Sequence, residues 1–111
     1  MEKRHCIVLC TCPDEASARR IAEHLVERRL AACVNLIAGV RSVYVWQGET
    51  ETASEVQLVI KTSVARYDAV ERQIQQLHPY ELPEIVAVPI MAGLEGYLEW
   101  IDSATATPTH H

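Results

Sequence analysis

The segment ACVNLIAGVRSVYVW, residues 32–46, predicts a long strand. It is rich in β-branched and aromatic residues, which favour an extended strand, and Gly39 marks a point where this strand can bend. A second strand is predicted at 55–62 (EVQLVIKT), with the polar residues 47–54 as the turn region between the two. A strand of 15 residues spans roughly 50 Å. We therefore expect a hairpin that projects beyond the body of a small domain.

The segments on both sides of this hairpin predict the architecture. Residues 5–12 alternate as a strand does, and an N-capping Asp14 begins a helix that runs to about residue 29. After the hairpin, helical spacing covers 64–77 and the apolar run 84–90 predicts a last core strand. The order β-α-β-β-α-β, with a closing helix at 94–102, predicts an α+β ferredoxin-like sandwich. Helices then cover one face of an antiparallel sheet.

The chain is predicted to form a single domain that needs partners. Residues 1–103 suit one core, and the polar residues 104–111 are predicted to be a disordered tail. The tail ends in His110 and His111, to which we assign no role. The first strand is apolar on both faces and the last is almost continuously apolar, so the sheet needs a second cover. The unpaired edge of the hairpin has the same need. We therefore expect several copies of the chain to assemble.

Composition excludes several classes of protein. The chain has 15 acidic and 10 basic residues and a net charge of −5, whereas proteins that bind nucleic acid normally carry a basic patch. No apolar run approaches the roughly 20 residues of a membrane-spanning helix. The apolar part of the N-terminal segment is also too short for a secretion signal. We expect a cytoplasmic protein with neither a nucleic-acid nor a membrane partner.

Four cysteines, Cys6, Cys10, Cys12 and Cys33, are all predicted to be reduced thiols. They are too few for a secreted disulfide scaffold, and their spacing lacks the C-x2-C pair of structural zinc sites. The first three share one face of the first predicted strand. Any of these three can therefore contribute to a site on that face.

The segment HPYELPE, residues 78–84, supplies the other candidate residues. Pro79 disfavours helical backbone at His78, so the preceding helix is predicted to end there. A purely structural interpretation makes His78 a helix-terminal residue and Cys10 a small buried hydrophobe. Together with the Glu84 carboxylate, this thiol and imidazole also make a suitable set for a thiophilic metal. Such ligands favour copper or zinc over magnesium or calcium.

Two other functions are disfavoured. A Cys10 nucleophile with His78 as its base would need an orienting group and an oxyanion hole, and no local signature of a cysteine hydrolase is present. RNA-recognition domains share the predicted element order, but they place stacking aromatics on central strands, and the first strand here has none. We therefore expect a protein that is not an enzyme.

The chain resembles the CutA divalent-cation tolerance family over about residues 5–102. The resemblance is carried by spaced blocks in the right order: LCTCPDEASA (9–18), LAACVNL (30–36), SVYVWQGE (42–49), EVQLVIKT (55–62) and HPYELPEI (78–85). It implies a ferredoxin-like subunit in a tight homotrimer, a cytoplasmic location, and a link to tolerance of copper and other heavy metals.

The resemblance also implies a weak copper(II) site. The ligands in the family are the Cys of the LCT block and the His of the HPY block, which correspond to Cys10 and His78. Some members have two adjacent His residues before the Pro, and this chain has Leu77 in place of the first of them. Glu84 is our candidate carboxylate ligand, and Cys12 is a secondary candidate.

An alternative function rests on a related architecture. The trimeric PII signalling proteins have similar subunits and bind small ligands in clefts between them. By this analogy of fold, the chain would be a signalling or scaffold trimer whose HPYELPE segment lines a cleft for a metabolite or partner.

Overall fold

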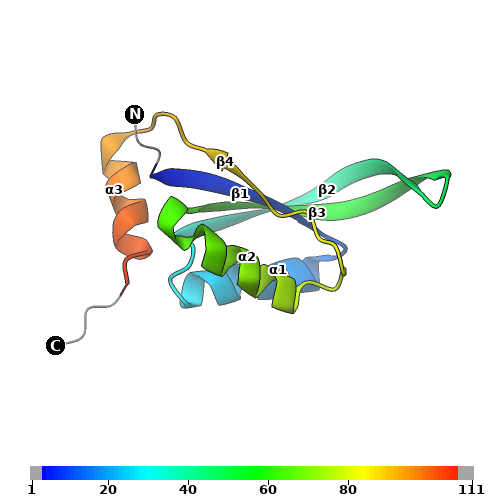
Figure 1. Cartoon of the computed structure of the whole chain (residues 1–111), viewed down its shortest axis with the longest axis horizontal. Helices are drawn as coiled ribbons and strands as arrows, with labels where there is room; N and C mark the ends of the chain where they lie inside the picture. The colour runs from blue at the N-terminus through cyan, green and yellow to red at the C-terminus, as the bar shows by residue number, and fades with distance from the viewer. Residues whose placement is uncertain (1–3, 108–111) are drawn as a thin grey trace.

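A computed structural model describes residues 4–107 of the chain (Figure 1). Its elements are β1 (His5–Cys12), α1 (Glu15–Glu27), β2 (Cys33–Trp46), β3 (Glu49–Ser63), the short 3₁₀ helix η1 (Val64–Arg66), α2 (Tyr67–Leu77), β4 (Val86–Pro89) and α3 (Glu95–Ala104). The strands form one antiparallel sheet in the order β2-β3-β1-β4. The helices α1 and α2 pack together on one face, and α3 lies at the end of the sheet away from the hairpin tip (Figure 1). The predicted ferredoxin-like sandwich is confirmed.

The core lies between the sheet and the helices α1 and α2. Every second side chain of β1 points toward the helices. The register places Cys10 opposite Leu58 of β3. The apolar stripes of the two helices cover this layer. The fully buried members are Val8, Cys10, Cys12, Ala18, Ile21, Leu25, Leu58, Ile60, Val70 and Ile74. The prediction that Cys6, Cys10 and Cys12 share one face of β1 is confirmed, and this face is the buried one.

Helix α1 begins at the predicted N-cap. The backbone N–H of Ser17 donates to Asp14 Oδ1 at 2.7 Å, which satisfies one of the amides that a helix start leaves without a partner. This hydrogen bond holds the pKa of Asp14 below its ordinary value of 3.8. The cap therefore ties the start of α1 to the end of β1.

Asp14→Ala should lower the melting temperature at neutral pH, because Ser17 loses its acceptor. The pKa of Asp14 is lower in the folded state, so its contribution is complete above 3.8 and is lost as the pH falls through the folded-state pKa. Melting curves by circular dichroism between pH 7 and pH 2 should show the difference from wild type closing in acid. Asp14→Asn, which caps without titrating, is the control; a difference that does not change with pH would contradict the prediction.

The hairpin of β2 and β3 turns more tightly than predicted. Gln47 and Gly48, with φ of 52° and 80°, form the turn, and β3 begins at Glu49. The expected turn region 47–54 is therefore wrong beyond Gly48. Positive φ at both central residues matches the twist of the strands and lets them pair at once. The predicted bend at Gly39 is confirmed, since its φ is 78° and the register of β2 on β3 shifts there.

The hairpin projects from the body, as predicted (Figure 1). The molecule measures 53 × 30 × 21 Å, and its radius of gyration is 15.0 Å, against about 13 Å for a compact domain of this size. Its outer half exposes apolar side chains, with Val43 and Val45 exposed by 68% and 69%. Residues 4–107 of a single chain leave this apolar surface uncovered.

The last strand is shorter and more exposed than predicted. The sequence predicted a core strand over 84–90, whereas β4 covers Val86–Pro89 and all four of its residues are exposed. It lies at the edge of the sheet, with β1 as its neighbour. Pro89 has no N–H to donate, which suits an edge. The apolar run therefore marks a surface that a single subunit leaves open.

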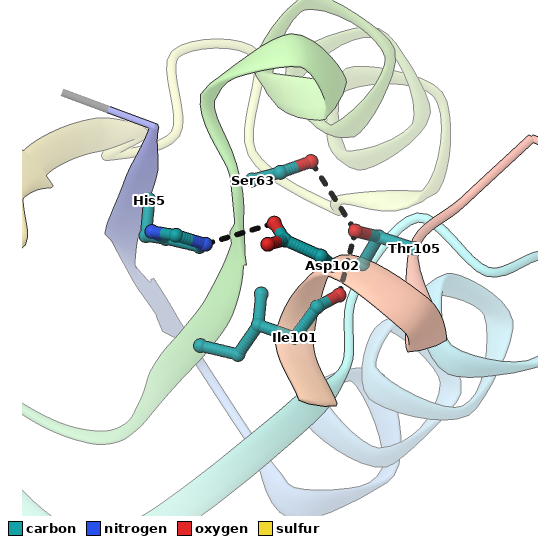
Figure 2. A network of polar contacts seen from close by, with 5 residues as sticks. All are labelled: His5, Ser63, Ile101, Asp102 and Thr105. Atoms are coloured by element: carbon teal, nitrogen blue, oxygen red, sulfur yellow. Dashed lines mark hydrogen bonds and ion pairs between the residues drawn. The ribbon is translucent and has the colours of Figure 1, made fainter. Parts of the chain in front are cut away.

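Helix α3 is held at the end of the sheet by the polar contacts in Figure 2. The Nε2 of His5 lies 2.8 Å from Oδ1 of Asp102. The hydroxyl of Thr105 donates to the Ile101 carbonyl at 2.8 Å and lies 3.2 Å from Ser63 Oγ. Thr105 is buried and α3 ends at Ala104, so ordered structure continues into the predicted tail. Residues 108–111 lie outside the described residues.

Candidate metal centre

The end of β1 and the end of α2 bring three candidate ligands together. Cys10 and Cys12 lie on the buried face of β1, and His78 directly follows α2 with the extended backbone that Pro79 predicts. Their two sulfur atoms and a ring nitrogen all lie within 4.8 Å of one another. The predicted pair Cys10 and His78 is thus placed together, and the secondary candidate Cys12 joins it.

Glu84 is not placed in this group. Its side chain is exposed and lines a cleft beside the cluster. Its charge still acts on the site, since Glu84 is one of the groups that raise the pKa of Cys10. The carboxylate is therefore near the three ligands without belonging to them.

Both ring nitrogens of His78 are engaged in hydrogen bonds. Nε2 lies 2.7 Å from the carbonyl oxygen of Thr11, and the backbone N–H of Tyr80 donates to Nδ1 at 3.1 Å. A carbonyl can only accept, so Nε2 carries the proton and the ring is the neutral tautomer with its lone pair on Nδ1. This arrangement agrees with the purely structural interpretation, in which His78 only ends a helix. A metal ion must break one of these two hydrogen bonds.

The pKa values of Cys10 and Cys12 are shifted in opposite directions. A hydrogen bond between them raises the pKa of Cys10, and burial raises it further. The same hydrogen bond lowers the pKa of Cys12, and Ser17 at the start of α1 adds to this lowering. Since the thiolate is the form that binds metals, the lowered pKa favours Cys12 as the first thiolate of the pair.

The donor set fits a thiophilic ion. Two sulfur atoms and one imidazole suit copper or zinc and do not suit magnesium or calcium. A tetrahedral zinc site would need a fourth ligand, such as water. All four cysteines are free, as predicted. Both cluster sulfurs are fully buried and His78 is 7% exposed, so an ion reaches them only if a neighbouring group moves.

A cleft of about 700 Å³ lies between the hairpin and the 79–84 loop. It is lined by aromatic, acidic and a few other residues: Thr11, Tyr44, Trp46, Glu55, Pro79, Tyr80, Glu81, Leu82 and Glu84. Thr11 and Tyr80 also hydrogen-bond to His78. These two residues therefore lie between the cleft and the three candidate ligands Cys10, Cys12 and His78, called the metal cluster below.

Sequence reasoning missed the contact between Tyr80 and Glu55. The Tyr80 hydroxyl donates to Glu55 Oε2 at 3.0 Å, and Glu55 is 7% exposed on β3. A Glu at the start of the buried strand EVQLVIKT was a weak signal that its carboxylate has a partner. Nothing in the sequence pointed to Tyr80 as that partner.

The chain belongs to a family described as CutA1 divalent ion tolerance protein, whose sequence model matches residues 6–104. The divalent-cation tolerance protein CutA of Thermus thermophilus is 46% identical over 99 residues, which cover 89% of this chain and 96% of that protein. The protein of the same name from Pectobacterium atrosepticum is 44% identical over 98 residues, covering 88% and 89%. The resemblance stated above is confirmed.

Solved structures of the family have the same fold. CutA from Xylella fastidiosa superposes with a TM-score of 0.90 at 44% identity, covering 91% of this chain and 97% of that one. CutA1 from Oryza sativa superposes with a TM-score of 0.92 at 36% identity, and the match covers 96% of this chain and 97% of that one. A CutA from Archaeoglobus fulgidus, described as periplasmic, superposes with a TM-score of 0.88 at 37% identity. The match covers 91% of this chain and 98% of that one. Between residues 4 and 107 we find no helix long and apolar enough to cross a membrane.

Proposed function

We propose that the protein acts in divalent-cation tolerance by binding the ion weakly and reversibly, as a cytoplasmic homotrimer, with copper(II) as the candidate ion. The observation that carries this proposal is the group of two thiols and one imidazole within 4.8 Å. Cys10 and His78 are the proposed ligands, and Cys12 is better placed than Glu84 to be the third. Family membership supports the link to divalent ions.

The proposed role is not enzymatic. The relatives are named as tolerance proteins. In addition, the proton on Nε2 of His78 is donated to the Thr11 carbonyl, and the Nδ1 lone pair accepts an amide hydrogen. The ring is therefore not oriented as a base toward either thiol, as a nucleophilic cysteine would require.

A homotrimer would cover the apolar surfaces that one subunit leaves open. The exposed hairpin residues Val43 and Val45, and the β4 residues Val86 and Val88, lie on the two edge strands of the sheet. Edge strands with apolar side chains tend to pair with another chain. The four free thiols suit a reducing compartment such as the cytoplasm.

Titration calorimetry of the purified protein with copper(II) tests the site. Cys10→Ser and His78→Ala should each weaken binding by roughly tenfold or more, since each removes one ligand of the set. Cys33→Ser is the matched control, because Cys33 is a free thiol outside the cluster. Equal affinity in wild type and both ligand variants would refute the assignment.

The second candidate function is the PII-like trimer, and the cleft beside the 79–84 loop favours it. Its volume of about 700 Å³ and its aromatic and acidic lining would accommodate a small ligand. Native mass spectrometry of the assembly purified from cells should then show a bound small molecule. A mass equal to that of the protein alone, with or without metal, would count against this alternative.

A further inference from the structure

Tyr80 covers the metal cluster on the side of the cleft. Its backbone N–H donates to Nδ1 of His78, and its ring lies against the imidazole with centroids 4.9 Å apart. Its hydroxyl donates to the buried carboxylate of Glu55 on β3. One residue thus occupies the free lone pair of the imidazole, covers the ring and is anchored to the sheet.

The cleft outside Tyr80 is negatively charged. The described residues that line it include three glutamates, Glu55, Glu81 and Glu84, and no Lys, Arg or His. A cleft lined by one sign of charge raises the local concentration of ions of the opposite sign. Cations are therefore concentrated on the side of the cluster that Tyr80 closes.

We propose that this cleft is the entrance to the metal cluster and that Tyr80 is its gate, latched shut by Glu55. The inference rests on the proposed metal-binding function. If Nδ1 coordinates the ion, it loses the hydrogen bond from the Tyr80 N–H. If Nε2 coordinates it, the proton moves to Nδ1 and faces that N–H. Either route requires Tyr80 to move. Movement of Tyr80 also breaks its hydrogen bond to Glu55. Glu84 at the cleft then attracts the ion without being a ligand.

The test follows the rate at which Cd²⁺, a thiophilic ion that does not change oxidation state, enters the cluster. Stopped-flow absorbance of the thiolate–cadmium band gives association and dissociation rates separately. Tyr80→Phe keeps the ring and removes the latch. Association should then be about tenfold faster, because opening no longer breaks a hydrogen bond to a charged group. The dissociation rate should stay the same, because the latch is broken when the ion is bound.

Two further variants make the result specific. Tyr44→Phe makes the same chemical change within the same cleft, at a hydroxyl with no hydrogen bond to the described residues, and should leave both rates unchanged. Glu84→Gln should slow association about two- to threefold and weaken its dependence on salt. Faster dissociation in Glu84→Gln would instead make Glu84 a ligand and overturn its assigned role at the entrance.

The outcomes separate this inference from the proposed function. If wild-type protein binds no Cd²⁺, both the metal site and its gate are refuted. If wild type binds Cd²⁺ and Tyr80→Phe associates at the wild-type rate, the gate is refuted and the metal site stands. Faster association in Tyr80→Phe with an unchanged dissociation rate supports the gate, since a variant that merely loosened the structure would also release the ion faster.

Discussion

Leu58→Ala should lower the free energy of unfolding by about 2–5 kcal/mol, the usual range for a large side chain deleted from a packed core. Leu58 is 0% exposed at the centre of the sheet, opposite Cys10 on β1 and Leu36 on β2. The helices α1 and α2 close the core over this face, so the space left by the side chain is difficult to fill by relaxation. Urea unfolding at a fixed protein concentration measures the effect.

Leu82→Ala is the matched control for this prediction. The same atoms are removed, but Leu82 lies in the 79–84 loop and is 91% exposed. A change within about 0.5 kcal/mol is expected for such a surface position. Equal losses of stability in the two variants would mean that Leu58 is not in a packed core.

The second large effect concerns assembly. Val43→Lys/Val45→Lys should convert the proposed trimer to monomers at micromolar concentration. The two valines are exposed by 68% and 69% in the single chain, so the substitutions should not disturb the subunit itself. In a trimer they would place unpaired ammonium groups in an apolar interface, which costs several kcal/mol for each buried charge. Sedimentation velocity and circular dichroism measure assembly and fold on the same samples.

The conservative pair Val43→Ile/Val45→Ile controls for the change in side-chain size at these positions. It should sediment as wild type does, because it keeps the apolar surface of the hairpin. A lysine variant that still sediments as a trimer would show that the outer hairpin is not part of the interface. Wild-type protein that is monomeric at micromolar concentration would refute the trimer itself.

Much of the fold could be predicted because its signals are local. Alternation over residues 5–12 and 55–62 identifies two strands and the residues that share each face. Asp14 begins α1, and Pro79 ends α2 at the residue before it. Each signal involves residues only a few positions apart in the sequence. Over that distance, backbone sterics and the alternation of side chains determine the local structure directly.

The errors occur where structure depends on distant partners. The run 84–90 is apolar enough for a core strand, yet β4 lies at an edge and all four of its residues are exposed. Hydrophobicity indicates that a surface needs a cover, but it does not say whether the same subunit supplies it. The polar residues 49–54 were predicted as a turn, yet they pair with β2 along an exposed hairpin. There the pairing of the backbone overrides composition.

The candidate site shows the same division. The residue types of Cys10, Cys12 and His78 follow from the sequence alone. So do the shared face of the two cysteines on β1 and the place of His78 where α2 ends. Their approach to within 4.8 Å, the hydrogen bond from His78 to Thr11 across 67 positions and the latch from Tyr80 to Glu55 across 25 exist only in the tertiary structure. Local periodicity carries no information on which distant side chains meet. That is decided by the order of the strands and their register, which place the loop after α2 against the end of β1.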